Sequence, residues 1–355
     1  MKGLLLAGGH GTRLRPLTYT GNKHMLPIGN KPMLFYGLEH LRDAGVKDVG
    51  IVLGPVKEGV MEAVGDGSKF GIDVTYIEQG EPKGLAHAVM ISEDFIDNEP
   101  FVMYLGDNLL KQGAKPLVEV FEKEQSDCVI GVAKVEDPSR YGNVEVRNGK
   151  VIKLVEKPEK PKSDLALIGI YVFNPIVFEA VKKIKPSWRN ELEITDAIQL
   201  LLNSGRKVDL QLVSGWWKDT GRPEDILEAN RLVLEDLQPR MEGVAEQDAK
   251  TQGRVATGKN TVVRRGSIVR GPAVIGQDCE IGPDTYVGPF TSIGDGVTIR
   301  GSEVENTIVM NNCHIECDKR IVDSLIGAGT QIISADKETP KGHKFILGEL
   351  SRISI

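Results

Sequence analysis

A glycine-rich turn and two cations follow the first apolar run of the chain. The segment LAGGHGTR, residues 6–13, would let backbone N–H groups approach a phosphate, and Arg13 adds a guanidinium fork. Lys23 follows closely and would supply a second cation. A Walker loop is excluded because no Gly-Lys-Ser/Thr follows, and the spacing differs from the dinucleotide fingerprint. Without its neighbours, the segment could equally be a tight strand-to-helix turn.

Two aspartates far apart in the sequence, Asp107 and Asp219, each follow an apolar run. Carboxylates at the carboxyl ends of sheet strands lie where such sheets bind ligands. Oxygen ligands of this kind suit Mg²⁺ held together with a triphosphate. The competing interpretation is two turn-forming aspartates.

Other polar residues suit a nucleotide base and a sugar phosphate. The amide of Gln79 can pair with a base edge, and Gly84, which opens a helical segment, permits a flat base to approach. Glu156 beside Lys157 offers a carboxylate for sugar hydroxyls and an ammonium group for phosphate. By itself, Glu-Lys-Pro is a common surface tripeptide. His24 and His87 are expected to be packing or surface groups.

The elements that must position these residues alternate over residues 1–237. Strands are predicted at 4–6, 49–53, 74–77 and 101–105, and helices at 32–44, 60–64 and 85–96. This alternation predicts an α/β domain with a mainly parallel sheet covered on both faces.

The second half of the chain has a different period. Residues 238–261 are polar with weak periodicity and are predicted to be a linker. Residues 262–355 form the second predicted domain, in which an aliphatic residue recurs every sixth position from Val269 to Ile321, often followed by Gly, with a phase slip near 303–307. A six-residue repeat predicts a solenoid of short parallel strands and resembles the left-handed β-helix of hexapeptide-repeat proteins.

Composition limits the class of protein. The formal net charge of -6 argues against a nucleic acid partner, and no apolar stretch is long enough to span a bilayer. The N-terminal apolar stretch is too short for a signal peptide. The four cysteines fit no common zinc motif and are expected to be reduced packing residues, so we predict a cytoplasmic protein.

Nine motifs in order resemble the sugar nucleotidylyltransferase family, most closely its long, thymidylyl-transferring members. They are LAGGHGTRLRPLT, NKHMLPIGNKPM, VGDGSKFGI, YIEQGEPKGLAHA, YLGDN, DPSRYGNVEV, EKPEKPKSDLALIGIYVF, NELEITD and WWKDTG. The resemblance covers residues 1–237 and implies a Rossmann-like, mainly parallel mixed sheet followed by the left-handed parallel β-helix. Short members of the family lack that second part.

The resemblance also implies roles for single residues. Arg13, Lys23, Lys157 and Asp107 would be catalytic, and Asp107 and Asp219 would hold Mg²⁺. The nucleotide would contact Leu6, Gly8, Gly9, Gly11, Thr12, Gln79, Pro82, Gly84 and Asp107. The sugar phosphate would contact Asn108, Tyr141, Gly142, Glu156, Lys157, Gly169, Tyr171 and Arg189.

The implied reaction joins dTTP and glucose 1-phosphate to give dTDP-glucose and pyrophosphate. It needs no covalent intermediate, because positioning and charge stabilisation suffice. The alternatives are use of UTP or ATP, an added acetyltransferase with His314 or His343 as base, and a non-catalytic sugar-nucleotide sensor. The β-helix is expected to serve in regulation or in contacts of a homo-oligomer.

Overall fold

The computed structural model describes residues 1–334, 350, 351 and 353. Contacts divide the chain into two compact units. The first comprises Met1–Gly11, Gly21–Met25 and Met33–Asp219, and the second comprises Thr12–Thr20, Leu26–Pro32 and Thr220–Ile355. Each unit has a hydrophobic core of its own.

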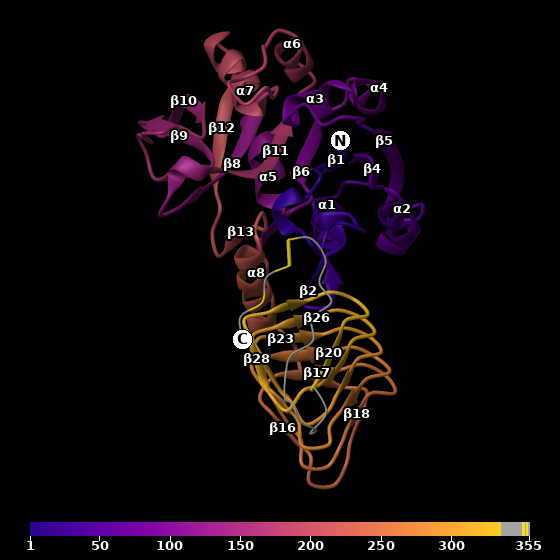
Figure 1. The fold of residues 1–355 in the computed structure, drawn as a ribbon. Coiled ribbons are helices and arrows are strands. Elements are labelled where there is room, and N and C mark those ends of the chain that lie inside the picture. The colour runs from indigo at the N-terminus through magenta and orange to yellow at the C-terminus, as the bar shows by residue number, and fades with distance from the viewer. Residues whose placement is uncertain (335–349, 352, 354–355) are drawn as a thin grey trace. The chain divides into compact units, whose positions relative to one another are not determined.

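A nine-stranded mixed sheet lies at the centre of the first unit (Figure 1). Its strands are β1 (Lys2–Ala7), β4 (Asp48–Leu53), β5 (Asp73–Glu78), β6 (Phe101–Leu105), β8 (Cys128–Lys134), β9 (Gly142–Arg147), β10 (Lys150–Glu156), β11 (Leu165–Phe173) and β12 (Val208–Leu212). The order is β10-β9-β11-β6-β1-β4-β5, with β8 beside β11 and β12 beside β8. Strands β6, β1, β4 and β5 are parallel, whereas β11 runs antiparallel to β6. The sheet is therefore the mixed, Rossmann-like one that was expected.

Both faces of this sheet are buried, because successive side chains of a strand point to opposite sides. Leu4 and Leu6 of β1 join one apolar cluster, and Leu5 and Ala7 join the other. The first unit contains the helices α1 (Met33–Asp43), α2 (Glu58–Val64), α3 (Leu85–Met90), α4 (Glu93–Ile96), α5 (Lys115–Glu124), α6 (Val177–Val181) and α7 (Ile194–Asn203). Short 3₁₀ turns are η2 (Lys23–Met25), η3 (Ser68–Phe70) and η4 (Pro138–Arg140).

The single helix predicted over 85–96 is wrong. The structure has α3 and α4 instead, separated at Ile91 and Ser92. The buried Ser92 hydroxyl donates to the carbonyl of Ala88 at 2.7 Å. Serine readily bonds local backbone groups, which favours a helix boundary that apolar spacing alone does not reveal.

Three parallel sheets of short strands form a prism in the second unit (Figure 1). One sheet contains β14 (Arg240–Met241), β17 (Val255–Thr257), β20 (Ala273–Ile275), β23 (Thr291–Ile293), β26 (Ile308–Val309) and β29 (Leu325–Ile326). The next contains β15 (Val244–Ala245), β18 (Val262–Val263), β21 (Glu280–Ile281), β24 (Thr298–Ile299), β27 (His314–Glu316) and β30 (Gln331–Ile333). The third contains β16 (Lys250–Gln252), β19 (Ile268–Arg270), β22 (Tyr286–Val287), β25 (Glu303–Glu305) and β28 (Arg320–Val322). This arrangement agrees with the predicted left-handed β-helix.

The six-residue repeat supplies the core of the prism. Its aliphatic residues from 269 to 299 are at most 1% exposed, and those 18 positions apart stack in register. They are Val269, Ile275, Ile281, Val287, Ile293 and Ile299. Residues 238–261, expected to be a linker, instead carry β14 to β17, which pair with the next coil. Strands β14 and β16 of the first coil are exposed and carry polar residues, so they lack the apolar pattern from which strands are predicted.

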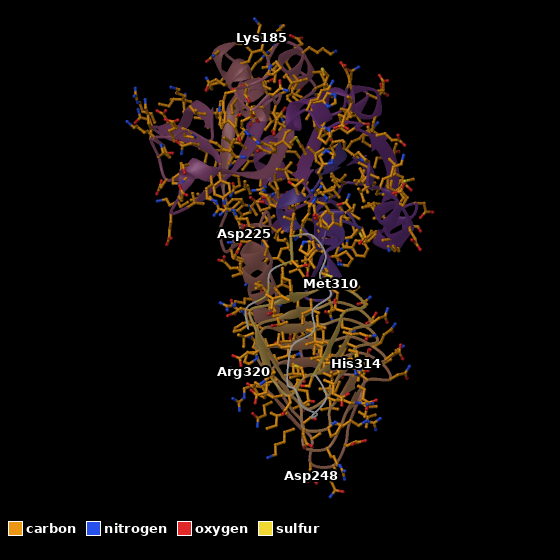
Figure 2. The ribbon with its side chains drawn as sticks, in the orientation of Figure 1. Lys185, Asp225, Asp248, Met310, His314 and Arg320 are labelled. Carbon is orange, nitrogen blue, oxygen red and sulfur yellow. The ribbon has the colours of Figure 1, made fainter. Side chains whose placement is uncertain are left out.

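Three further features complete the description. The second unit also holds the 3₁₀ turn η1 (Thr12–Leu14), the antiparallel pair β2 (Pro27–Ile28) and β3 (Lys31–Pro32), and α8 (Pro223–Glu235). The four cysteines are buried and free, as expected of packing residues. His314 lies on the outside of the prism, 3.4 Å from a Glu316 oxygen (Figure 2). His343 lies outside the described residues.

Candidate functional site

The glycine-rich turn after β1 is closely approached by two side chains of the first unit. A Cβ at Gly8 would lie 2.4 Å from Oε1 of Gln79, and one at Gly9 would lie 3.4 Å from Cε of Lys23. Gly11 has a φ of 63°, a conformation that other residues rarely adopt. Glycine at positions 8 and 9 thus leaves room for Gln79 and Lys23 beside this backbone. Leu6 precedes the turn at the buried end of β1.

Lys23 forms an ion pair with Asp107, which immediately follows β6 at the carboxyl edge of the sheet. Burial would raise the pKa of Asp107, but the Lys23 ammonium and a hydrogen bond from Asn108 hold it below its usual range. The amide of Asn108 donates to Oδ1 of Asp107 at 3.0 Å. The carboxylate is consequently charged at neutral pH.

The neighbouring His24 is buried and neutral at physiological pH. Burial, with help from Lys23, lowers its pKa to about 3. Its backbone N–H donates to Oδ1 of Asn22 at 2.9 Å, and the amide of Asn22 donates to the carbonyl of Ala7 at 3.1 Å. His24 is therefore a packing group, as expected, and Asn22 ties the Lys23 turn to the end of β1.

The segment between β5 and α3 carries the residues predicted to contact a base. The amide nitrogen of Gln79 lies 3.5 Å from the carbonyl of Gly84 and 3.3 Å from Nδ1 of His87. Gly84 has a φ of 103°, and a Cβ there would lie 2.5 Å from the carbonyl oxygen of Leu192. Pro82 lies half-buried in the same segment. The structure thus brings Gln79 to the glycine-rich turn on one side and to Gly84 on the other.

Asp219 and Asp107 come from two paired short strands. Strand β13 (Trp217–Asp219) runs antiparallel to β7 (Asn108–Leu110), with Asp219 opposite Asn108. The two carboxylates therefore occupy neighbouring register positions, although they are far apart in sequence. No cluster of three or more His, Cys, Asp or Glu side chains that could hold a metal occurs among the residues described. Two carboxylates fit a divalent cation that also takes phosphate and water oxygens.

Asn108 is held from three sides. Besides its bond to Asp107, its Oδ1 accepts from the indole N–H of Trp217 at 2.7 Å and from the backbone N–H of Gly169 at 3.2 Å. The Trp217 ring meets that of Tyr141 edge-on, with centroids 5.2 Å apart. Of the predicted sugar contacts, Gly169 is therefore bonded directly to Asn108, and Tyr141 is joined to it through Trp217.

Glu156 and its cationic neighbours Lys157 and Arg189 form the second group of predicted sugar-phosphate residues. A Glu156 oxygen lies 3.6 Å from Nη1 of Arg189 and 3.9 Å from Nζ of Lys157. Burial raises the pKa of Glu156, as does Glu193, whereas Lys157 and Arg189 oppose them. A Cβ at Gly142 would lie 3.3 Å from Oε2 of Glu156.

Backbone conformation also distinguishes this group. Lys157 has a φ of 40°, which is strained for a residue with a side chain. Such a conformation persists where the surrounding structure fixes the backbone. The backbone N–H of Lys157 donates to the carbonyl of Tyr141 at 3.1 Å, which links this group to the Asn108 group.

Arg13 and Thr12 belong to the second unit and are exposed. Within that unit the Arg13 guanidinium lies against Gly221, where a Cβ would come within 3.1 Å of Nη2. Tyr171 is 3% exposed in the sheet core, stacked with Phe173, so its contact with a sugar stays a prediction.

Sequence reasoning missed three residues that orient predicted ones. Trp217 fixes Asn108, Thr195 donates to Oε2 of Glu156 at 3.2 Å, and Glu193 accepts from Arg189 at 3.3 Å. All three lie in the quoted motifs WWKDTG and NELEITD, so the motifs pointed to the right segments. Only the fold shows which side chains of those segments turn toward the site.

Comparison with known proteins identifies the class that this fold and site define. A family model described as nucleotidyl transferase matches residues 2–236, and one described as the GMPPB C-terminal domain matches residues 267–339. The chain belongs to the nucleotidyl transferase family, within the sugar nucleotidyltransferases.

Two relatives are similar over the whole length. The low-salt glycan biosynthesis nucleotidyltransferase Agl11 of Haloferax volcanii is 48% identical over 357 residues, which cover 100% of both chains. The glucose-1-phosphate thymidylyltransferase of Streptomyces antibioticus is also 48% identical over 357 residues, covering 100% of this chain and 99% of that protein. A crystal structure of UDP-glucose pyrophosphorylase complexed with UDP-glucose is 30% identical with a TM-score of 0.60, over 66% of this chain and 98% of that one.

Proposed function

We propose that the protein transfers a thymidylyl group from dTTP to glucose 1-phosphate, forming dTDP-glucose and pyrophosphate with Mg²⁺. The observation that carries this proposal is the Lys23–Asp107 pair beside the backbone of Gly9, with Asp219 at a neighbouring register position. A cation, two carboxylates and a glycine-rich turn of the backbone suit a metal-bound triphosphate. Full-length similarity to a thymidylyltransferase supports the choice of substrates.

The proposed binding roles follow the two groups of side chains. Gln79 and Gly84 would hold thymine, and Asn108, Gly169 and Glu156 would accept or donate hydrogen bonds to the glucose hydroxyls. Lys157 and Arg189 would attract the sugar phosphate. Asp107 and Asp219 would hold Mg²⁺, which when bound neutralises charge on the triphosphate.

The reaction requires two anions to be brought together. A phosphate oxygen of glucose 1-phosphate forms a bond to the α-phosphorus of dTTP, and the bond from that phosphorus to the bridging oxygen breaks. The electron pair leaves with pyrophosphate. Lys157 would orient the attacking phosphate, while Lys23 and Arg13 would stabilise charge on the departing phosphates. No side chain needs to form a covalent intermediate.

Discrimination between thymine and uracil depends on one methyl group, worth about 1–3 kcal/mol. UTP is therefore the second candidate, and the structural similarity to a UDP-glucose pyrophosphorylase favours it over ATP. Three further roles from the sequence analysis stay open. They are an acetyltransferase reaction at the prism, a non-catalytic sensor function, and assembly of a homo-oligomer through the prism.

One assay tests the proposal. The protein is incubated with Mg²⁺, glucose 1-phosphate and each of dTTP, UTP, ATP, GTP and CTP, and pyrophosphate release is measured. We expect the highest kcat/KM with dTTP. A preference for UTP would overturn the thymidylyl assignment but keep the reaction class. Absence of release with every nucleotide would favour the sensor, and acetyl transfer from acetyl-CoA to an aminosugar phosphate would reveal a second activity.

A further inference from the structure

One buried asparagine joins three parts of the second unit. Asn230 of α8 is fully buried, and its Oδ1 accepts from the backbone N–H of Gly29 at 2.8 Å and from the hydroxyl of Ser292 at 2.7 Å. Its amide nitrogen donates to the carbonyl of Phe290 at 3.0 Å. Each of these three hydrogen bonds thus connects α8 with either the β2–β3 turn or the prism.

The β2–β3 turn reaches the prism directly as well. The amide of Asn30 donates to the carbonyl of Ile293 at 2.5 Å, at the end of β23. Asn30 has a φ of 62°, and Ile28 in the preceding strand is completely buried. A segment from the first tenth of the chain is therefore anchored on the middle of the prism.

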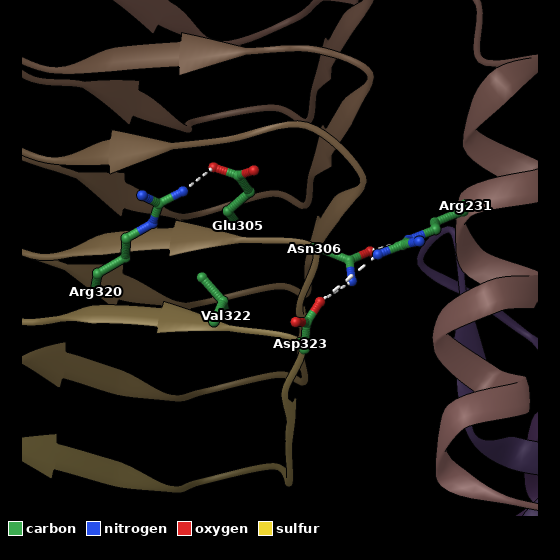
Figure 3. A pocket seen from close by; sticks show the side chains of 6 residues that line it. All are labelled: Arg231, Glu305, Asn306, Arg320, Val322 and Asp323. Carbon is green, nitrogen blue, oxygen red and sulfur yellow. Dashed lines mark hydrogen bonds and ion pairs between the residues drawn. The ribbon is translucent and has the colours of Figure 1, made fainter. Parts of the chain in front are cut away.

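A second anchor holds α8 to the prism. Nε of Arg231 donates to Oδ1 of Asn306 at 2.6 Å, and the amide of Asn306 donates to Asp323 (Figure 3). Nη2 of Arg231 lies 3.6 Å from Oδ1 of Asp323. These residues line a hollow of about 460 Å³, and each guanidinium group along it already faces a carboxylate. We interpret the hollow as the edge of the contact that fixes α8 to the prism.

The same unit contains Arg13 and its supports. The Arg13 guanidinium lies against Gly221, directly before α8. Leu14 is 1% exposed, and a methyl group of Leu17 lies 3.5 Å from the Cβ position of Gly327, which follows the last strand of one prism sheet. The Arg13 side chain therefore lies against the segment that leads into α8, and Leu17 lies against the prism.

We propose that the prism and α8 position Arg13 for the transfer reaction, and that Asn230 is the positioning residue that locks this arrangement. The proposal rests on the role of Arg13 given under the proposed function. A misplacement of about 1 Å in a catalytic group can cost roughly 100-fold in rate. A buried asparagine with three hydrogen bonds is well suited to prevent such a shift, because any movement leaves polar groups unpaired.

The test compares variants of the full-length chain. Asn230→Ala removes the three hydrogen bonds of the Asn230 side chain. Asn30→Gly removes only the hydrogen bond from the β2–β3 turn to the prism, and glycine tolerates the positive φ at this position. Thr285→Ala is the control, because Thr285 is equally buried in the prism but bonds only prism carbonyls. We expect kcat to fall roughly 10- to 100-fold in the two asparagine variants, with the KM values little changed. The control should retain its kcat.

A double-mutant cycle separates positioning from general destabilisation. Arg13→Ala alone should lower kcat by at least roughly 100-fold. If Asn230 acts through Arg13, Asn230→Ala adds little to that loss, whereas independent effects would multiply. Multiplying effects, or a normal kcat in Asn30→Gly, would overturn the inference. Near-normal kcat in Arg13→Ala itself would instead overturn the proposed role of Arg13. If Asn230→Ala does not fold, the cycle is run with Asn30→Gly.

Discussion

The carboxyl group of Glu156 is surrounded by opposing charges. Arg189 and Lys157 attract it, whereas Glu193 repels it across their shared partner Arg189. Burial and Glu193 together leave the pKa of Glu156 above its ordinary value. The carboxyl group of Glu156 accepts hydrogen bonds from sugar hydroxyls well only while it is ionised.

A pH profile should report this arrangement. As the pH falls through the raised pKa of Glu156, the KM for glucose 1-phosphate should rise, because the protonated acid is a poorer acceptor. Glu193→Gln removes the repelling charge, so it should lower the pKa of Glu156 and move this rise to lower pH. The substrate phosphate titrates identically with both enzymes, so the comparison isolates the protein. Superimposable profiles would contradict this account.

At this scale, the sequence predicts which residues carry charge but not which ones orient them. Glu156 and Lys157 lie in one of the motifs, Arg189 immediately precedes another, and the structure brings the three together. The bond between Trp217 and Asn108 joins residues 109 positions apart, through strands too short to predict. Orientation therefore had to come from the tertiary structure.

Among the elements, β11 contributes to the site by close approach. Its Gly169 leaves room for Asn108, since a Cβ there would lie 2.7 Å from Cγ of Asn108 and from Cγ of Leu105. Central strands disfavour glycine, so its presence marks this contact.

Gly169→Ala should displace Asn108 and weaken sugar binding. Loss of about one hydrogen bond, 1–1.5 kcal/mol, corresponds to a roughly tenfold increase in the KM for glucose 1-phosphate. Steady-state kinetics with varied glucose 1-phosphate measure this change. Gly59→Ala in α2 is the control, because nothing lies within 4 Å of its Cβ position. An unchanged KM in Gly169→Ala would show that Asn108 does not bind the sugar.

The elements also show where periodicity succeeds. The six-residue repeat predicts the prism because its positions from Val269 to Ile315 are buried, and the slip near 303–307 corresponds to shorter coils. The repeat fails to show the first coil, where Lys250 and Gln252 are exposed. An exposed strand such as β16 does not need the apolar residues that mark the buried repeat positions.

In the whole molecule, the second unit is assembled from three stretches of chain. Residues 12–20 and 26–32 belong to the same compact unit as α8 and the prism. Local pattern cannot predict this division, because it depends on contacts such as that between Asn30 and Ile293, 263 positions apart.

Destabilising the prism should therefore abolish activity together with prism structure. Ile281→Ala, at a completely buried position, should cost about 2–5 kcal/mol. Activity and circular dichroism followed in parallel through a urea titration should decline at the same lowered concentration. Ile152→Ala, at a position 39% exposed, should leave the midpoint nearly unchanged. Activity that outlasts the prism in urea would refute the coupling.

The contact between the Asn30 turn and the prism has a consequence during protein synthesis. The turn at Asn30 leaves the ribosome early, but its partner Ile293 follows 263 residues later. At about 5–20 residues per second, that delay is roughly 15 to 50 s. Over this interval the nascent chain can already pair β1 with β4 and β6, but the Arg13 segment still lacks its support. We therefore expect a ribosome-bound chain to become active only after the prism residues up to about Ile293 have emerged.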